Sequence, residues 1–154
     1  MSASVVAIYI CPVAGEKMQL VDSVEAIAGR GLAGDRYCNG VGCFSHKQGG
    51  NRQVTLINGI FFERSLFAYG DSRRNIVTRD IELMALIGEY FEIGTTLFRG
   101  VRYCKPCNRP SDLIKSKESF RDVFRDCGGL VAEVSGNGII KTGDSISLIR
   151  SSNY

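Results

Sequence analysis

The sequence has no long apolar run, little net charge and only one histidine, His46, among its 154 residues. The apolar stretch near its start, residues 5–12, is too short to span a bilayer. No basic residues precede that stretch, as they would in a secretory signal. These absences argue against a membrane or secreted protein, and we expect a cytoplasmic protein without a membrane partner.

The charge of the chain is too small and too dispersed to indicate a nucleic-acid partner. Lys and Arg together number 19 and Asp and Glu 16, which gives a formal net charge of +3. A nucleic-acid surface needs a clustered excess of positive charge, whereas a phosphate-bearing small molecule needs only a local group of cations. The composition therefore favours a small-molecule ligand over DNA or RNA.

Internal repeats, low-complexity tracts and inter-domain linkers are also absent from the sequence. Its length suits one domain that buries its core without crosslinks. We therefore predict a single domain over residues 1–154, with its core over about residues 5–149. The six cysteines are expected to be free thiols, because a chain without a secretory signal belongs in a reducing compartment.

Most of the regular structure predicted from the sequence is β-strand, because short β-branched or alternating runs are separated by turn residues. The predicted strands cover residues 4–10, 20–27, 52–57, 89–93, 95–98, 130–134, 139–141 and 145–149. No alternation of strands and helices indicates a parallel sheet. The prediction is a mainly β fold with a few short helices, in which the strands form a closed or nearly closed β-barrel.

Two local features extend this prediction. Residues 59–69 are predicted to form a helix whose apolar side chains, at roughly helical spacing, lie in the core. Those side chains are Ile60, Phe61, Leu66 and Phe67. Residues 135–138 (Ser-Gly-Asn-Gly) are predicted to form a hairpin-like turn between two strands, and residues 112–125 to form one or two short amphipathic helices.

The strongest chemical signal is the segment Cys104-Lys105-Pro106-Cys107, in which two residues separate two thiols. Four cations lie in or near this segment: Arg99, Arg102, Lys105 and Arg109. Nearby cations stabilise a thiolate, which is the form that attacks electrophiles and binds metals. The pattern indicates a reactive cysteine, and thiols half-buried at a strand end are the plainer alternative.

Two further segments are candidates for binding an anion. The glycine-rich turn 28–36 presents backbone N–H groups beside Arg30 and Arg36. Residues 73–75 (Arg-Arg-Asn) precede a short β-branched run, and guanidinium forks suit phosphate or carboxylate. Neither segment has the spacing of a P-loop or of a dinucleotide fingerprint, and ordinary solvated turns remain the alternative.

Four segments, taken in order, make the chain resemble the MOSC domain family, named for the C-terminal domain of molybdenum cofactor sulfurase. They are residues 31–36 (Gly-Leu-Ala-Gly-Asp-Arg), 52–57 (Arg-Gln-Val-Thr-Leu-Ile), 73–78 (Arg-Arg-Asn-Ile-Val-Thr, leading to Ile93-Gly94) and 104–107 (Cys-Lys-Pro-Cys). With the flanking strands, the resemblance covers roughly residues 5–149.

The resemblance implies a barrel-like β fold, a pocket for molybdopterin and a cysteine that carries sulfur or ligates molybdenum. Short members of the family often have this cysteine in a Pro-Cys step, which is Pro106-Cys107 here. Cys107 is therefore the first candidate for the reactive group and for the metal ligand, and Cys104 is the second. The cofactor-binding residues implied are Gly34, Asp35, Arg36, Arg73, Arg74, Asn75, Lys105 and Arg109.

The expected function is to bind the molybdenum cofactor and to carry or transfer sulfur, as a cysteine persulfide, to a metal centre. No pyridoxal-phosphate desulfurase domain is present, so a partner such as a cysteine desulfurase is expected to supply the sulfur. The alternative is a small molybdoenzyme that reduces N-hydroxylated compounds. It would need an electron-donor protein, because the sequence has no flavin, haem or iron–sulfur motif.

A second alternative is a non-enzymatic β domain stapled by zinc. Cys38 and Cys43, with four residues between them, would join Cys104 and Cys107 to supply four thiolate ligands. The first spacing is loose and the two pairs lie far apart in the sequence, so zinc is the less favoured cofactor.

Overall fold

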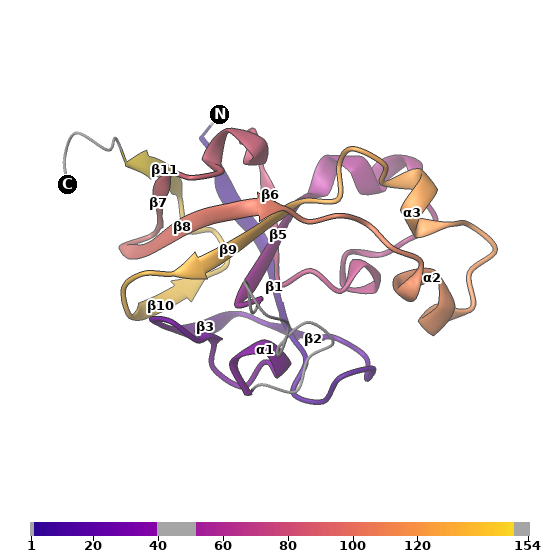
Figure 1. The fold of residues 1–154 in the computed structure, drawn as a ribbon, viewed down its shortest axis with the longest axis horizontal. Helices are drawn as coiled ribbons and strands as arrows, with labels where there is room; N and C mark the ends of the chain where they lie inside the picture. The colour runs from indigo at the N-terminus through magenta and orange to yellow at the C-terminus, as the bar shows by residue number, and fades with distance from the viewer. Residues whose placement is uncertain (1, 40–51, 150–154) are drawn as a thin grey trace.

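The computed structural model describes residues 2–39 and 52–149, and it is mainly β with a few short helices, as predicted (Figure 1). The strands are β1 (Ser4–Ile10), β2 (Gln19–Val21), β3 (Ser23–Ile27), β4 (Gly31–Leu32), β5 (Val54–Asn58), β6 (Ile76–Arg79), β7 (Tyr90–Ile93), β8 (Thr96–Tyr103), β9 (Leu130–Val134), β10 (Gly138–Lys141) and β11 (Ile146–Ile149). The helices are α1 (Arg36–Asn39), α2 (Arg109–Ile114) and α3 (Phe120–Val123), with 3₁₀-helices η1 (Gly59–Arg64), η2 (Tyr69–Ser72) and η3 (Leu83–Leu86).

Eight strands form one sheet in the order β11-β7-β8-β9-β5-β6-β1-β2. Its neighbours pair antiparallel except β5 and β6, a parallel pair that the sequence did not indicate. The sheet curls until β1 meets the chain before β11, where Val5 N donates to Asp144 O at 2.9 Å. The edge strands β11 and β2 do not pair with each other. The sheet is thus a curled, open half-barrel, and the expected closed barrel is not confirmed.

A second sheet has the order β10-β3-β4, and it corrects the predicted hairpin. β10 pairs with β3 instead of β9, because the turn between β9 and β10 is held by other strands. The N–H groups of Ser135 and Gly136 donate to Leu97 O on β8, at 2.9 and 3.1 Å. Asn137 Oδ1 accepts from Ala28 N at 2.7 Å, beyond the end of β3. These bonds turn the chain away from β9 and into the second sheet.

Strands β1, β5 and β6 are covered on both faces by apolar side chains. On their inner face Ile8, Leu56 and Ile76 belong to the core enclosed by the curled sheet. On the outer face Ile57 and Val77 join a second, mostly aromatic cluster. Successive side chains of a strand point to opposite faces, so a continuous apolar run such as that of β5 supplies both cores.

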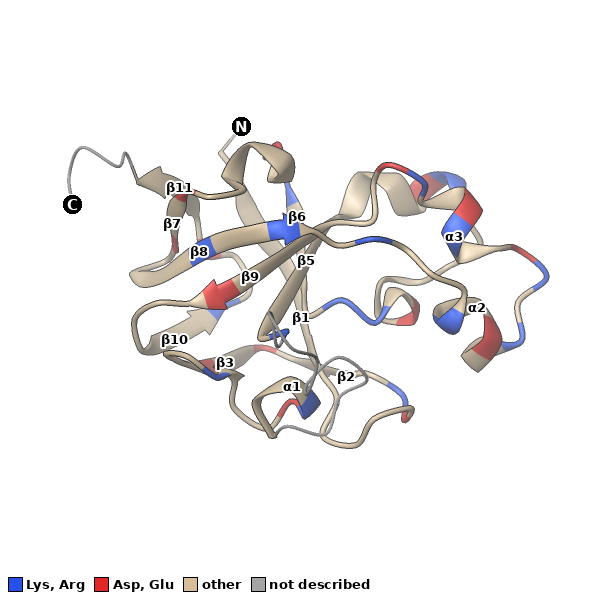
Figure 2. Ribbon diagram, in the orientation of Figure 1, with Lys and Arg blue, Asp and Glu red and all other residues tan. Residues whose placement is uncertain are grey.

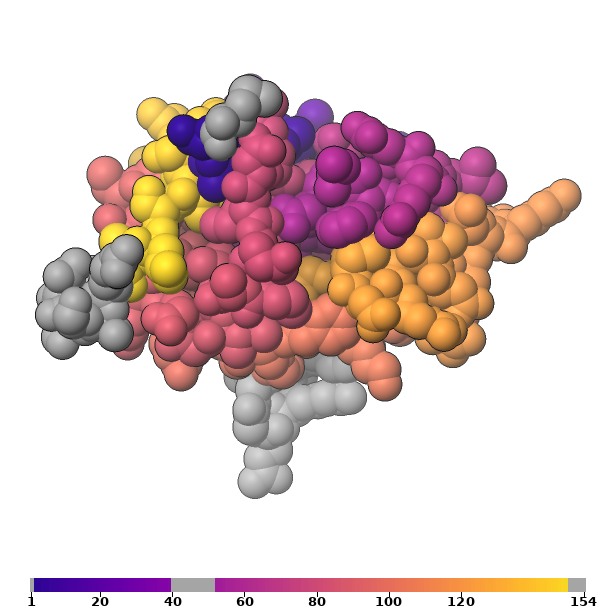
Figure 3. Space-filling view, turned by 90° about the horizontal axis from the view of Figure 1, so that it is seen from above, coloured from indigo at the N-terminus to yellow at the C-terminus, as the bar shows by residue number. Residues whose placement is uncertain are grey.

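The second cluster lies under the lobe built from η1, η2, α2 and α3. Figure 3 shows the segments 59–72 and 109–127 side by side on this lobe. Their contact is aromatic: the rings of Phe67 and Phe120 meet edge to face with centroids 5.2 Å apart. Ile60 and Leu66, predicted as core, are instead 66% and 75% exposed. Residues 59–69 do not form the predicted single helix, so helical spacing does not apply across them.

Charged residues of both signs are interspersed along the ribbon (Figure 2). Within residues 2–39 and 52–149, no helix has both the length and the apolar character needed to cross a membrane.

Candidate functional site

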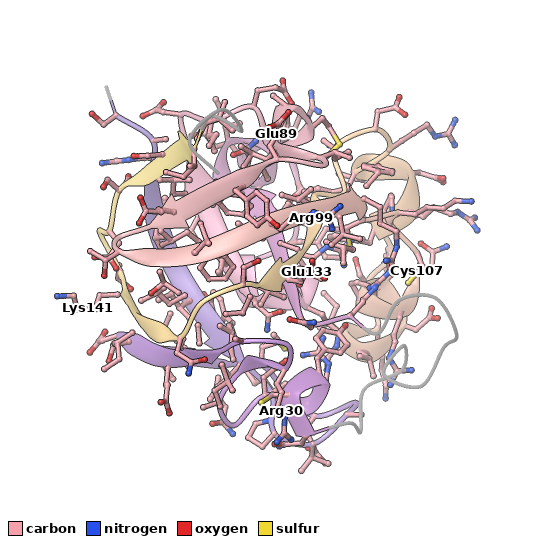
Figure 4. The ribbon with its side chains drawn as sticks, turned by 60° about the vertical axis from the view of Figure 1, so that its left-hand side comes forward. Arg30, Glu89, Arg99, Cys107, Glu133 and Lys141 are labelled. Carbon is pink, nitrogen blue, oxygen red and sulfur yellow. The ribbon has the colours of Figure 1, made fainter. Side chains whose placement is uncertain are left out.

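Cys107 lies in the link between the end of β8 and the start of α2, and its side chain is exposed. Figure 4 shows it on the side of the molecule opposite Lys141. Cys104, three residues earlier, is completely buried, and its backbone N–H donates to Gly129 O at 2.9 Å. The two candidate thiols, of which Cys107 was the first choice and Cys104 the second, therefore differ in access to solvent, and of these two only Cys107 is open to a reagent.

The segment that presents Cys107 rests directly on Gly128. A Cβ atom at position 128 would overlap the carbonyl oxygen of Cys104 and come within 2.7 Å of Pro106 Cδ. Asn108 fixes the other side of the thiol, because its Oδ1 accepts from Ser119 Oγ at 2.8 Å and from Arg121 N at 3.2 Å. The link is thus held from both sides, by the glycine step before β9 and by α3.

We expect Gly128→Ala to destabilise the protein by about 1–3 kcal/mol, because the added methyl group forces backbone atoms apart. The free energy of unfolding from urea titration measures this effect. Gly136→Ala is the matched control, since its Cβ would make only an ordinary 3.5 Å contact with Leu97 Cβ. Equal stability of the two variants would contradict the close approach at Gly128.

Cys107 lines a small hollow together with several arginines, which we call the arginine hollow. Its volume is about 40 Å³. The lining residues are Ala14, Gly15, Arg36, Tyr37, Arg52, Arg73, Arg74, Cys107, Arg109 and Pro110. They come from five separate parts of the chain, which the fold brings together beside α2. Guanidinium groups bind carboxylate and phosphate through paired N–H donors, so the hollow is suited to an anion.

Arg74 is the most deeply buried cation at the hollow besides Arg36, with 5% of its surface exposed. Its Nε donates to Gly128 O at 2.8 Å, and its Nη1 lies 3.4 Å from Ser72 O. Its Nη2 is buried and has no hydrogen-bond partner in the described part of the chain. The guanidinium also lies over the ring of Phe120, 5.7 Å from the centroid. Backbone contacts therefore hold Arg74 in position and leave one of its donors unused.

Arg36 and Arg73 are anchored in different ways. Arg36 Nη1 pairs with the buried carboxylate of Asp35 at 3.1 Å, and its Nη2 donates to Tyr37 Oη at 3.0 Å. Arg73 has a left-handed backbone conformation (φ 64°), and its Nη1 donates to Glu16 O at 2.8 Å. Its Nη2 lies 3.5 Å from Cys11 Sγ. Arg36 thus has a local counter-charge, whereas Arg73 contacts neutral acceptors.

A second, larger hollow of about 530 Å³ shares Gly15 and Arg73 with the first. Its other lining residues are Tyr9, Glu16, Lys17, Met18, Ala68, Gly70, Asp71, Leu113 and Ile114. Burial raises the pKa of Tyr9, and the neighbouring Tyr69 and the Asp71 carboxylate raise it further, so Tyr9 stays a neutral hydrogen-bonding group. The size is that of a typical small-molecule pocket, and the arginine hollow adjoins it at Gly15 and Arg73.

The structure brings five of the predicted site residues to these hollows: Arg36, Arg73, Arg74, Cys107 and Arg109. Asp35 is fully buried and makes contacts within the protein: its Oδ1 accepts from Cys11 N at 2.8 Å and pairs with Arg36. Asn75 is also fully buried, with Oδ1 accepting from Thr55 N at 3.0 Å and Nδ2 donating to Tyr9 O at 3.2 Å. Asp35 thereby helps to position Arg36, whereas the Asn75 side chain ties β5 and β1 to the segment before β6.

Three other predicted residues lie elsewhere. Gly34 packs near Ile10, and the exposed Lys105 is not among the described residues that line either hollow. Cys104 is buried behind Cys107. Sequence reasoning assigned no role to Gly15, Tyr37 or Arg52. Arg52 is the first residue of the segment 52–57, which contributes to the family resemblance. That position could have marked Arg52 as a candidate site residue.

The zinc alternative finds no support in the described residues. Within 2–39 and 52–149, no group of three or more His, Cys, Asp or Glu side chains is arranged to hold a metal ion. Cys38, Cys104 and Cys107 are therefore not gathered, and Cys43 and His46 lie outside the described residues.

Cys107 is expected to react with iodoacetamide at least about tenfold faster than Cys127 at neutral pH, because it is the more accessible thiol. Burial raises the pKa of the Cys127 thiol, the Asp126 carboxylate adds to this, and Arg64 opposes it. Peptide mapping by mass spectrometry after timed labelling gives the rate at each cysteine, including Cys43. Faster labelling of Cys127 or Cys104 than of Cys107 would contradict the exposure difference.

The profile of the MOSC domain family matches residues 51–147, more than half of the chain, so this protein belongs to the MOSC domain family. The predicted resemblance is thereby confirmed, although the segment 31–36 lies outside the match. The family is associated with binding of the molybdenum cofactor. Comparison with curated protein sequences gave no significant match.

Solved structures show the same fold. The YuaD protein from Bacillus subtilis superposes with a TM-score of 0.77 and 18% identity, covering 96% of each chain. YiiM from Escherichia coli gives a TM-score of 0.68 at 17% identity, covering 97% of this chain and 70% of that one. YiiM from Geobacillus stearothermophilus gives 0.67 at 16% identity, covering 96% and 75%. At these identities the comparisons establish the fold.

Proposed function

We propose that this protein binds the molybdenum cofactor and carries sulfur on Cys107 for delivery to a metal centre. The observation that carries the proposal is the exposed Cys107 thiol on the arginine hollow, which adjoins a pocket of small-molecule size at Gly15 and Arg73. Membership of the MOSC family supports the binding of the molybdenum cofactor. The exposed position of the thiol supports the proposal that Cys107 carries sulfur.

The residues at the two hollows fit the chemistry of the cofactor. Arg73 and Arg74 offer guanidinium donors for an anionic group, and one donor of Arg74 is buried without a partner among the described residues. The larger hollow combines polar groups with the apolar side chains of Leu113 and Ile114, which suits a pterin ring. When bound, the molybdenum centre supplies a soft acceptor for sulfur, and the Cys107 thiolate is a soft ligand of matching type.

Sulfur loading on Cys107 is a thiol exchange. The Cys107 thiolate attacks the outer sulfur of a donor persulfide, a new S–S bond forms, and the S–S bond of the donor breaks. The donor leaves as a thiolate and Cys107 becomes a persulfide, so no net oxidation occurs. An exposed thiol suits a protein donor such as a cysteine desulfurase, which has to bring its own persulfide into contact.

Metal and pterin content of gently purified protein, compared with that of Cys107→Ser, tests the proposal. Pterin in both proteins, together with persulfide formation only in the wild type, is the expected result for a sulfur carrier. Molybdenum lost in the variant would make Cys107 a metal ligand instead and favour a reductase of N-hydroxylated compounds. A protein that retains no pterin and accepts no sulfur would overturn the proposal.

A further inference from the structure

The arginine hollow holds more buried positive charge than the described residues neutralise. Arg74 is 5% exposed, its guanidinium donates hydrogen bonds only to backbone oxygens and lies over the Phe120 ring, and no carboxylate lies within 4.0 Å of it in the described ranges. Arg73, which lines the same hollow, contacts a backbone oxygen and the Cys11 sulfur. A buried charge without a counter-charge is costly. Binding an anion in the hollow would remove that cost.

The size of the hollow limits the anion to a small one. Its volume is about 40 Å³, whereas a water molecule needs roughly 10–15 Å³ of such space. There is room for one tetrahedral oxyanion, and a fused ring has to use the neighbouring hollow. Arg109 forms one side of this hollow close to Gly15, since its Nη2 lies 3.3 Å from where a Cβ atom on that glycine would be.

The hollow also contains a nucleophile, because the exposed Cys107 lines it beside Arg74 and Arg109. A molecule that uses both features has an anionic tetrahedral head joined to a transferable sulfur atom. Thiosulfate and organic thiosulfonates have this form. Phosphate and sulfate share the head but carry no sulfur for transfer.

We propose that Cys107 takes its sulfur from a thiosulfate-type donor whose sulfonate group binds in the arginine hollow. The Cys107 thiolate attacks the outer sulfur of thiosulfate, forming a new S–S bond, and the original S–S bond breaks with both electrons going to the departing sulfite. Sulfite leaves and the persulfide remains on Cys107, so atoms and charge balance without a further oxidant or reductant. This inference rests on the proposed function, because it names the class of donor for the sulfur that Cys107 carries.

The arginines serve two purposes in this reaction. They bind the oxyanion head of the donor, and they stabilise the negative charge that gathers on sulfite as it departs. The terminal phosphate of the cofactor is a second source of the same head group. The sulfonate group of the donor and the phosphate of the cofactor would therefore occupy the hollow one at a time. For the same reason, inorganic phosphate is expected to compete with thiosulfate.

The test is to incubate the reduced full-length protein with thiosulfate in the absence of oxygen. Sulfite release and the mass of the Cys107 peptide are then followed. The expected result is one sulfite released for each sulfur atom gained on Cys107, and none of either with Cys107→Ser. Added sulfate or phosphate should slow the loading.

Arg109→Gln, at an exposed arginine, tests the hollow without disturbing the core. We expect it to lower the rate at which thiosulfate loads Cys107 about tenfold, because one charge-assisted hydrogen bond to the donor is lost. For each protein, the rate of loading from thiosulfate is divided by the rate at which uncharged iodoacetamide alkylates Cys107. This ratio corrects for a change in the reactivity of the thiol. Arg125→Gln is the matched control, since Arg125 is 73% exposed and lies outside both hollows.

Two outcomes would overturn this inference and leave the proposed function standing. One is loading of Cys107 by cysteine persulfide but not by thiosulfate. The other is thiosulfate loading that neither phosphate nor Arg109→Gln affects. Failure with both donors, in a protein that also retains no pterin, would instead overturn the proposed function.

Discussion

Replacing Cys107 with serine is expected to reduce the rate of persulfide formation by more than about a thousandfold. Serine is a poor nucleophile, and removing the nucleophile of a reaction typically lowers its rate by factors of this size. Serine nearly preserves the size of the side chain, and the exposed position makes no core contact. The fold should therefore remain intact. Persulfide formation is measured by the mass of the Cys107 peptide after treatment with cysteine persulfide.

Cys104→Ala is the matched control for this variant. Cys104 is fully buried between β8 and the Gly128–Gly129 step, so it is not expected to exchange sulfur with a donor. The variant should load Cys107 within about twofold of the wild-type rate, and its stability should fall by about 1 kcal/mol for the lost buried sulfur. Loss of loading in a folded Cys104→Ala protein would show that both thiols take part.

The second large effect is expected for Arg74→Met, which removes the buried charge and keeps most of the side-chain length. Loss of a buried charge partner typically costs about 2–5 kcal/mol of binding free energy, so the affinity for sulfate or phosphate should fall at least about thirtyfold. Affinity is read from the rise in melting temperature with anion concentration, since an anion that binds only the folded protein stabilises it by mass action. Pterin retention should fall in parallel.

Arg64→Met is the control for Arg74→Met. Both guanidinium groups lie over a phenylalanine ring, Arg64 at 5.6 Å from the Phe61 centroid and Arg74 at 5.7 Å from that of Phe120. Arg64 lies outside the two hollows at Cys107, so its replacement should leave the anion response unchanged. If Arg74→Met does not fold, Arg74→Gln, which also removes the charge, is measured in the same way. An anion response in a folded Arg74 variant equal to that of the wild type would contradict the anion site.

Local patterns predicted much of the fold because they reflect local physics. β1 covers Ser4–Ile10, the bounds predicted from its segment rich in β-branched residues, since strand propensity and alternation are properties of neighbouring residues. The hairpin at 135–138 was predicted wrongly because the partner of a strand depends on distant bonds. Ser135 and Gly136 are held by Leu97, and Asn137 by Ala28, and no turn pattern contains that information.

The candidate site shows the same division. Residue chemistry was sufficient to select the Cys104–Cys107 segment and the arginines at 73 and 74, because cations beside a thiol and paired guanidinium groups are visible in the sequence. It was not sufficient to find Gly15, Tyr37 or Arg52, which line the arginine hollow from elsewhere in the chain. Asp35 and Asn75 remain predicted cofactor residues, and the sequence did not indicate that their buried side chains bond to Cys11, Thr55 and Tyr9.

The sequence by itself determined the mainly β class of this protein, its family and the presence of a cysteine among cations, because each depends on residue type and local order. Only the tertiary structure decided that the main sheet stays open, that Cys104 is buried while Cys107 is exposed, and that Arg74 lacks a counter-charge among the described residues. These features depend on which distant segments meet. Burial and charge compensation are properties of the assembled neighbourhood of a side chain.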